Sequence, residues 1–215
     1  MRKGLILAGG LGSRFSPATM GVSKHLFPIY DKPMLYYPLT TLMLAGIREI
    51  GIIGDVFNIE IYKKILGNGE GFGIDLTYII QKKPKGIPEA FSLARSFLSG
   101  CPCALILGDN FFYGAGLLDL LSLANGKEDR GHIFLTKVRD PNRFGIAELD
   151  SKKEVISFEE KVFNRAGIEL LFFENSLCET MDNWERPLSI FSLLEIFGPE
   201  VISSYVKLGK YFPPN

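Results

Sequence analysis

Three glycines, an arginine and a lysine near the N-terminus form the group of residues in this chain most suited to chemistry. Gly9, Gly10 and Gly12 lie close together, Arg14 follows, and Lys24 comes ten residues after it. Glycines let backbone N–H groups approach phosphate oxygens closely, and two cations can neutralise charge that builds up during phosphoryl or nucleotidyl transfer. The pattern indicates a nucleoside triphosphate site. On the residues alone, a surface salt bridge for Arg14 and a solvated surface position for Lys24 stay open.

The glycine-rich loop differs from two common phosphate-binding motifs. It lacks the GK[ST] ending of a P-loop at the required spacing. Gly10, Gly12 and Phe15 give GxGxxF, whereas the dinucleotide-binding fingerprint needs a small residue at the last position. The GGxG pattern alone is therefore weak evidence for a phosphate-binding loop, and a plain tight turn is the alternative interpretation. The longer string, which includes Pro17, Thr19, Lys24 and Pro28, strengthens the interpretation as a phosphate site.

Short apolar runs alternate with segments of helical periodicity around this loop. The runs predict strands over residues 4–8, 49–54, 76–81, 103–107 and 133–138, and the periodic segments predict helices over residues 34–45, 59–66, 88–98 and 117–124. Alternation of this kind favours right-handed βαβ units and a mainly parallel sheet flanked by helices. Further along, residues 170–173 are consistent with a strand, and residues 189–197 and 201–206 with helices.

Three polar segments follow predicted strands. They are residues 9–14, residues 81–86 and the pair Asp109 and Asn110. In parallel sheets, ligands bind beyond the carboxyl ends of the strands. We therefore expect these three segments to meet at one edge of the sheet.

Composition and charge describe an ordinary globular protein. Of the 215 residues, 47% are apolar and 22% charged, and the formal net charge is zero. With neither a basic stripe nor a polybasic tail, we expect no nucleic-acid or membrane partner. Cys101, Cys103 and Cys178 lack metal-site spacing, and buried free thiols are favoured over a redox pair. No signal-peptide pattern or membrane-spanning apolar run is present, which predicts a cytoplasmic location.

Several long strings in the first three quarters of the chain resemble one enzyme family. LAGGxGxRxxPxTxxxxKxxxP is similar to the signature of the sugar-phosphate nucleotidylyltransferases, and SKHLFPIYDKPMLYYPLTTLMLAGIREI resembles the branch that joins thymidylate to glucose-1-phosphate. The likeness continues through GFGIDLTYIIQ, LILGDNFFYG, DPNRFGIAELD and ISFEEK. It implies a three-layer α/β fold with a mainly parallel (mixed) sheet flanked by helices, the Rossmann-like nucleotidyltransferase fold. It also implies transfer of a nucleotidyl group from dTTP or UTP to glucose-1-phosphate, with release of pyrophosphate.

The resemblance gives the catalytic roles to three charged residues. Arg14 would hold the leaving pyrophosphate, Lys24 would stabilise charge at the α-phosphate, and Asp109 would bind Mg²⁺, a hard cation suited to carboxylate and phosphate oxygens. On the residues alone, a plain turn after a strand stays open for the Asp109-Asn110 pair, because both residue types favour turns. No protein nucleophile is required, since the sugar phosphate itself attacks the α-phosphorus.

The resemblance also implies which residues contact the two substrates. Those expected at the nucleotide are Gly9, Gly10, Gly12, Ser13, Arg14, Lys24, His25, Gln81, Gly86 and Asp109. Those expected at the sugar phosphate are Asn110, Gly145, Glu160 and Lys161. Composition alone allows residues 159–161 to be a solvated charged stretch, and it favours a solvated loop for the lysines of residues 82–85.

The chain also departs from the family pattern. His25 stands where glutamine is common, and Pro88-Glu89 replace a usual alanine-glutamine, which leaves the choice between thymidine and uridine nucleotides open. After Lys161, Val162 replaces a proline, and the segments that usually carry a second metal-binding aspartate are not found. We therefore predict a nucleotidyltransferase core over residues 1–161 and a divergent, shortened segment over residues 162–215. A weak or inactive nucleotide-binding relative is the alternative to an active enzyme, and a homo-oligomer is possible in either case.

Overall fold

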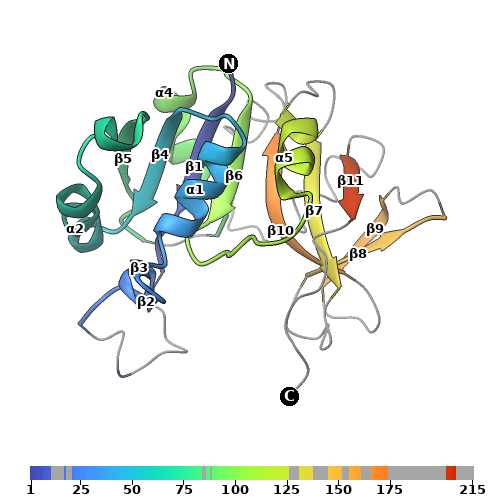
Figure 1. Ribbon diagram of the computed structural model, residues 1–215, viewed down its shortest axis with the longest axis horizontal. Helices are drawn as coiled ribbons and strands as arrows, with labels where there is room; N and C mark the ends of the chain where they lie inside the picture. The colour runs from blue at the N-terminus through green and yellow to red at the C-terminus, as the bar shows by residue number, and fades with distance from the viewer. Residues whose placement is uncertain are drawn as a thin grey trace.

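A nine-stranded mixed sheet forms the centre of the part of the chain that the computed structural model describes (Figure 1). The described residues are 1–10, 17, 21–83, 86–87, 89–125, 131–137, 145–151, 155–160, 166–173 and 202–206. Seven strands follow the order β11-β7-β10-β6-β1-β4-β5, and β8 and β9 branch from β10. A separate two-stranded hairpin is formed by β2 (Pro28–Ile29) and β3 (Lys32–Pro33).

Four strands form the parallel half of the sheet. They are β1 (Lys3–Leu7), β4 (Glu49–Gly54), β5 (Asp75–Ile80) and β6 (Cys103–Leu107). β1 lies between β4 and β6, with Leu5 opposite Gly51 on one side and Leu105 on the other. The apolar run in β1 is buried, as expected for a parallel strand covered on both faces. The strands predicted from the sequence are confirmed to within one or two residues.

The other strands add the mixed half. β7 (Gly131–Lys137) and β10 (Ala166–Phe173) pair antiparallel, and β10 also pairs antiparallel with β6. β8 (Gly145–Leu149) and β9 (Val155–Glu160) form an antiparallel pair joined to β10. β11 (Ile202–Val206) runs parallel to β7. The helix expected over residues 201–206 is therefore wrong. In so short an apolar segment, hydrophobic periodicity cannot distinguish a helix from a strand. Pairing with β7 makes this segment a strand.

Helices cover both faces of the parallel strands, as expected for three layers. α1 (Tyr36–Leu44) lies on one face, where a Cβ on Gly4 would come within 2.8 Å of Leu42 Cδ1. α3 (Glu89–Leu93) and α4 (Arg95–Leu98) replace the single predicted helix over 88–98, with a break at Ala94. Phe97 of α4 packs on the opposite face, because a Cβ on Gly51 would lie 3.2 Å from its ring.

The remaining helices are placed by local sequence signals. α2 (Val56–Leu66) begins after Asp55, whose side chain accepts hydrogen bonds from the backbone N–H groups of Phe57 and Asn58 at 3.0 and 3.1 Å. It ends at Gly67, which has a positive φ of 61°. α5 (Leu117–Asn125) lies in front of β7 and β10 in Figure 1. Two 3-10 turns, η3 (Lys24–Leu26) and η4 (Glu70–Phe72), complete the described elements.

Candidate functional site

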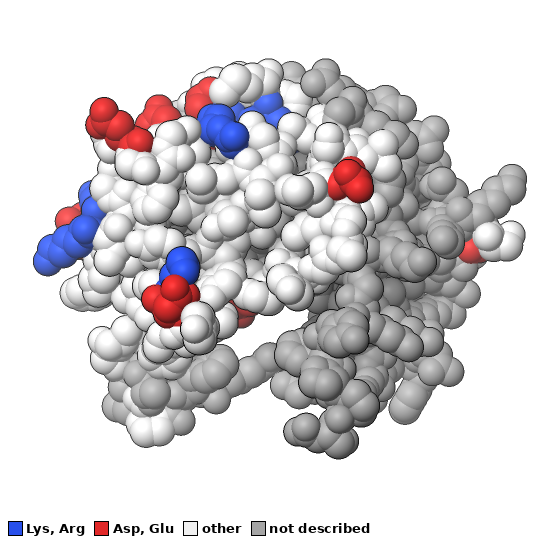
Figure 2. Space-filling model, viewed as in Figure 1, with Lys and Arg blue, Asp and Glu red and all other residues white. Residues whose placement is uncertain are grey.

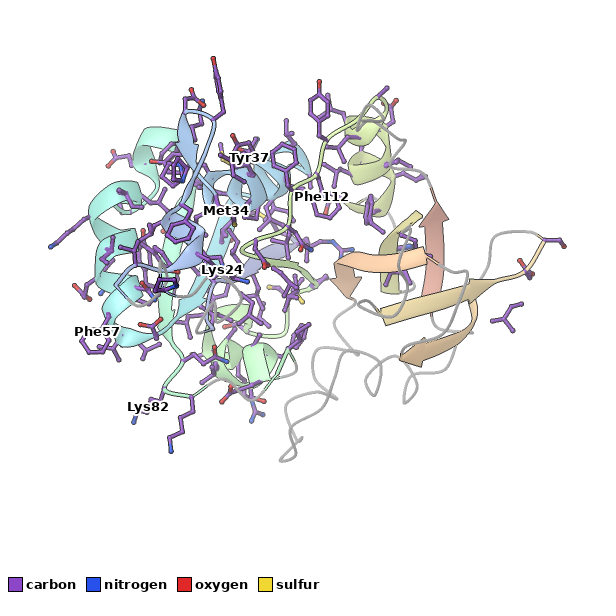
Figure 3. All side chains as sticks on the ribbon, turned by 90° about the horizontal axis from the view of Figure 1, so that it is seen from below. Lys24, Met34, Tyr37, Phe57, Lys82 and Phe112 are labelled. Atoms are coloured by element: carbon purple, nitrogen blue, oxygen red, sulfur yellow. The ribbon has the colours of Figure 1, made fainter. Side chains whose placement is uncertain are left out.

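The carboxyl ends of the four parallel strands lie at one edge of the sheet and bring together residues from distant parts of the chain. Gly9 follows β1, Gln81 follows β5, and Asp109 follows β6. Figure 3 is viewed from below, and it shows Lys24 lying among these strand ends while Lys82 points outward. The predicted convergence is therefore seen for residues 9, 10, 81 and 109. Lys82 and Lys83 are exposed, in keeping with a solvated loop.

Lys24 and Asp109 form an ion pair at this edge. Lys24 Nζ donates a hydrogen bond to Asp109 Oδ2, which joins residues 85 positions apart in the sequence. Their side chains are 20% and 36% exposed, so both charges face solvent at the mouth of the site. An exposed ion pair of this kind adds little to stability. An ammonium group and a carboxylate held side by side can instead engage a phosphate and a divalent cation.

A buried cluster of three polar side chains lies directly beneath Lys24. Ser23 Oγ lies 2.9 Å from His25 Nδ1, and Tyr62 OH lies 3.0 Å from Ser23 Oγ and 3.3 Å from His25 Nδ1. Tyr62 OH donates to the Ala8 carbonyl at 3.1 Å, which ties the cluster to the end of β1. His25 is only 1% exposed. Sequence reasoning placed His25 at the nucleotide, whereas its side chain makes its described hydrogen bonds with protein groups.

Burial sets the protonation states of this cluster. Loss of solvent lowers the pKa of His25 to about 4, helped by the positive charge of Lys24 and opposed by Asp109 and Asp55. Burial also raises the pKa of Tyr62 to about 12. At neutral pH both groups are therefore uncharged. A neutral imidazole and two hydroxyls can form hydrogen bonds with one another, so the cluster is buried without a net charge.

The His25 ring also packs tightly against the end of β6. A Cβ on Gly108 would lie 2.8 Å from His25 Cδ2 and 3.0 Å from Ala8 Cβ. The ring is therefore wedged between the strand ends of β1 and β6, one residue before Asp109. Because His25 neighbours Lys24 in η3, the packing and hydrogen bonds of His25 fix where Lys24 stands relative to Asp109.

A second contact links the first and second polar segments, residues 9–14 and residues 81–86. Gln81 is 4% exposed, and its Nε2 donates to Glu89 Oε2 at 2.7 Å. Its Oε1 lies against Gly9, where an added Cβ would overlap it. The sequence named Gly9 and Gln81 as candidate site residues and marked Glu89 as a departure from the family pattern that leaves the choice of base open. It did not predict the hydrogen bond between Gln81 and Glu89, which joins the end of β5 to the start of α3.

Some of the other predicted site residues lie in the described part of the chain, and the rest lie outside it. Gly10 and Gly86 have positive φ angles of 109° and 99°, which suit glycine turns at the edge. Asn110 continues the turn after β6, its N–H donating to the Leu107 carbonyl at 3.1 Å. Gly145 and Glu160 are directly opposite each other in the β8–β9 pair. The predictions for Gly12, Ser13, Arg14 and Lys161 lie outside the described residues.

Charges elsewhere on the described surface are dispersed. On the face shown in Figure 2, acidic and basic side chains lie singly or in small mixed groups among the described residues. Within the same residues there is no cluster of three or more potential His, Cys, Asp or Glu metal ligands. None of the described helices combines the length and the apolar character that crossing a membrane requires. Cys103 is buried and Cys101 is half-buried.

Comparison with curated proteins finds relatives that share one name. A glucose-1-phosphate thymidylyltransferase of Xanthomonas campestris is 48% identical over 160 residues, which is 74% of this chain and 54% of that protein. The Mycobacterium tuberculosis protein of the same name is 41% identical over 181 residues, which is 82% of this chain and 62% of that protein. The chain thus spans little more than half the length of the curated relatives it matches.

Solved structures share the fold. A Bacillus anthracis protein assigned as a glucose-1-phosphate thymidylyltransferase, in complex with sucrose, superposes with a TM-score of 0.86 at 29% identity, covering 95% of this chain and 86% of that one. A UDP-glucose pyrophosphorylase complexed with UDP-glucose has a TM-score of 0.78 at 20% identity, covering 95% and 90%, and shows the fold alone. The model of the nucleotidyl transferase family matches residues 3–212. With nearly its whole length matched, this chain belongs to the nucleotidyl transferase family.

Proposed function

We propose that this chain transfers a nucleotidyl group from dTTP, or from UTP, to glucose-1-phosphate and releases pyrophosphate. The observation that carries the proposal is the pairing of Lys24 with Asp109 at the strand ends where Gly9 and Gln81 also meet. The names of the curated relatives support the same reaction. Both substrates are strongly anionic, so the site must screen their repulsion and hold them in line for attack.

The described residues supply distinct parts of this reaction. Lys24 stabilises the charge that develops on the α-phosphate as the oxygen of the sugar phosphate attacks it, and pyrophosphate leaves on the opposite side. Gly9 and Gly10 let the backbone approach the phosphates. Gln81 recognises the base. The buried cluster of Ser23, His25 and Tyr62 positions Lys24 without touching the reacting groups.

Members of the nucleotidyl transferase family generally use a divalent metal, and we propose Mg²⁺ for this chain. Asp109 would supply a carboxylate oxygen at the mouth of the site. The donor set fits Mg²⁺, which binds through one or two carboxylates, substrate phosphates and retained waters rather than a full protein cage. The ion, when bound, neutralises charge on the phosphates. Asp109 would hold the ion through its carboxylate, and Lys24, which is hydrogen-bonded to Asp109 in the structure, would serve the α-phosphate.

Sugar recognition is proposed for the β8–β9 pair. The register sets Gly145 opposite Glu160 on the neighbouring strand. A carboxylate can accept hydrogen bonds from sugar hydroxyls, and the glycine leaves room for the ring. Asn110, in the turn after β6, is proposed to line the same pocket.

The test is a pyrophosphate-release assay with glucose-1-phosphate, Mg²⁺ and, in separate reactions, dTTP, UTP and CTP. We expect release with dTTP or UTP, and its loss in Lys24→Met and Asp109→Asn. The exposed ion pair of Lys32 and Asp31, with Nζ and Oδ2 2.6 Å apart, provides the matched controls Lys32→Met and Asp31→Asn, which should retain full activity. No release with any pyrimidine triphosphate would contradict transfer, and dTTP binding without release would favour the binding-protein alternative.

A further inference from the structure

We infer that Tyr37 is a positioning residue for the reaction, which sets where Lys24 stands relative to Asp109. This role rests on the proposed function, because it assumes that Lys24 stabilises the charge that develops on the α-phosphate. Tyr37 lies in the first turn of α1 and contacts the segments that follow both members of the ion pair. It acts through these segments and need not touch a substrate.

The hydroxyl of Tyr37 holds the segment that carries Lys24. η3 is followed directly by β2, and Tyr37 OH donates to the carbonyl of Ile29 in β2 at 2.6 Å. The backbone N–H of Leu35 donates to the His25 carbonyl at 2.9 Å. The stretch from η3 to the end of β2 is therefore fastened to the start of α1 at two places, and the side chain of Tyr37 provides one of them.

The turn of the β2–β3 hairpin depends on this hydrogen bond. Tyr30, next to Ile29, has a φ of 60° and is 97% exposed. A bulky residue in this conformation is strained, and it keeps the conformation only where surrounding contacts hold the backbone. The side chain of Tyr30 is almost fully exposed and contributes little, whereas the Ile29 carbonyl is bonded to Tyr37. Loss of that bond lets the hairpin relax, and the displacement passes along β2 to Lys24.

The ring of Tyr37 contacts the segment that carries Asp109. Its centroid lies 4.6 Å from that of Phe111, with the two rings tilted by 54°, within the range of favourable aromatic pairs. Phe111 is two residues beyond Asp109, and the turn between β6 and Phe111 is closed by the Asn110 N–H, which donates to the Leu107 carbonyl at 3.1 Å. Tyr37 thus joins the two segments whose charged side chains form the ion pair.

Loss of the hydroxyl is expected to lower turnover and to leave substrate binding nearly unchanged. Lys24 is proposed to act on charge that develops in the transition state, and an interaction of that kind contributes to kcat. A misplacement of about an ångström can cost on the order of a hundredfold in rate. Tyr37→Phe removes the hydrogen bond to Ile29 and keeps the ring contact with Phe111. We therefore expect kcat to fall about tenfold and KM for either substrate to change less than about twofold.

The experiment is steady-state pyrophosphate release by the full chain with glucose-1-phosphate, Mg²⁺ and the preferred pyrimidine triphosphate, at a temperature where circular dichroism shows every variant folded. Tyr36→Phe is the matched control: Tyr36 neighbours Tyr37 in α1, and its hydroxyl donates to the Ile65 carbonyl of α2 at 3.4 Å. The control should keep the wild-type kcat. Phe111→Leu breaks the link at the ring and serves if Tyr37→Phe does not fold.

A second comparison separates positioning from general support of the fold. In Lys24→Met the ammonium group is absent, so Tyr37→Phe has nothing left to misplace, and the double variant should turn over as fast as Lys24→Met alone. A merely structural role would lower kcat by the same factor in both backgrounds. If Lys24→Met is too slow for this comparison, the change in kcat against the change in KM in the single variants decides.

Two groups of results overturn the role of Tyr37 and are distinguishable. If wild type releases pyrophosphate and folded Tyr37→Phe keeps its kcat, loses it equally in both backgrounds, or loses no more than Tyr36→Phe, the positioning role is refuted while the proposed function stands. If wild type releases no pyrophosphate with dTTP, UTP or CTP, the proposed function fails and the role of Tyr37 fails with it.

Discussion

Acid is expected to destabilise this protein through His25. The imidazole is 1% exposed, and burial, its main perturbation, lowers its pKa from 6.5 to about 4. The charges that face it are Lys24, which lowers the pKa further, and Asp109 and Asp55, which raise it. Between these two pKa values the unfolded chain binds a proton that the folded chain excludes. Stability contributed by the neutral His25 is thus complete above about pH 6.5 and is lost as the pH falls toward 4.

The size of the effect follows from the two pKa values. A change from 6.5 to about 4 corresponds to about 3 kcal/mol, since one pH unit is about 1.4 kcal/mol. With these values the free energy of unfolding falls by about 2 kcal/mol between pH 7.5 and pH 5 through His25 alone. That is a large part of the stability of an ordinary domain.

Urea titrations of wild type and His25→Gln at several values between pH 7.5 and pH 5 measure this effect. Carboxylates and His132 are common to both proteins, so the difference between their unfolding free energies isolates His25. Ser23→Ala provides a matched control: it removes one hydrogen bond to the ring, lowers stability at every pH, and should keep the wild-type slope. If wild type and His25→Gln lose stability in parallel, to within about 0.5 kcal/mol, the buried neutral imidazole is refuted.

Three further substitutions test the site and its support. Lys24→Met should slow turnover about 10²–10³-fold while changing the free energy of unfolding by less than about 1 kcal/mol; pyrophosphate release and urea titration measure the two, and a matching collapse of stability would contradict a catalytic role. Tyr62→Phe removes the hydroxyl from the buried cluster and should lower the free energy of unfolding by about 1–3 kcal/mol, measured by urea titration. An unchanged urea midpoint would show that the hydrogen bonds of this hydroxyl do not stabilise the fold. Gly108→Ala should also cost about 1–3 kcal/mol, because its Cβ would meet the His25 ring at 2.8 Å. Gly71→Ala is the control, since nothing lies within 4 Å of its Cβ, and equal effects at the two glycines would argue against this tight packing.

The parallel half of the fold could be predicted because its signals are local. Residues 49–54 form a continuous apolar strand bounded by a charged residue and a helix-capping Asp55, and the structure has β4 at those residues. Hydrophobic periodicity does not distinguish a helix from a strand in short apolar segments, such as the one that forms β11 at the other edge of the sheet. The sequence predicts a helix over residues 201–206, whereas Ile202–Val206 form β11, whose partner β7 lies about 70 positions earlier in the sequence. Pairing over such a separation leaves no trace in a local pattern.

At the candidate site, too, the residue types could be predicted from the sequence, whereas the contacts between them could not. Lys24 and Asp109 could each be named from the sequence, but their pairing depends on β6 lying next to β1, which is a property of strand order. His25 could be named as an unusual residue in the loop. Its burial depends on Tyr62 of α2 and on Gly108 after β6, which approach it from two other elements.

Gly9 illustrates why residue type alone gives only part of its role. From the sequence, the glycine makes room for a phosphate. In the structure its missing side chain also admits Gln81 Oε1, from a residue that follows a strand two places away in the sheet. The position is therefore constrained from both sides, by the glycine-rich segment that it begins and by the Gln81 amide, which is hydrogen-bonded to Glu89. Any side chain at position 9 would displace Gln81, so under the proposed function base recognition and phosphate binding depend on the same glycine.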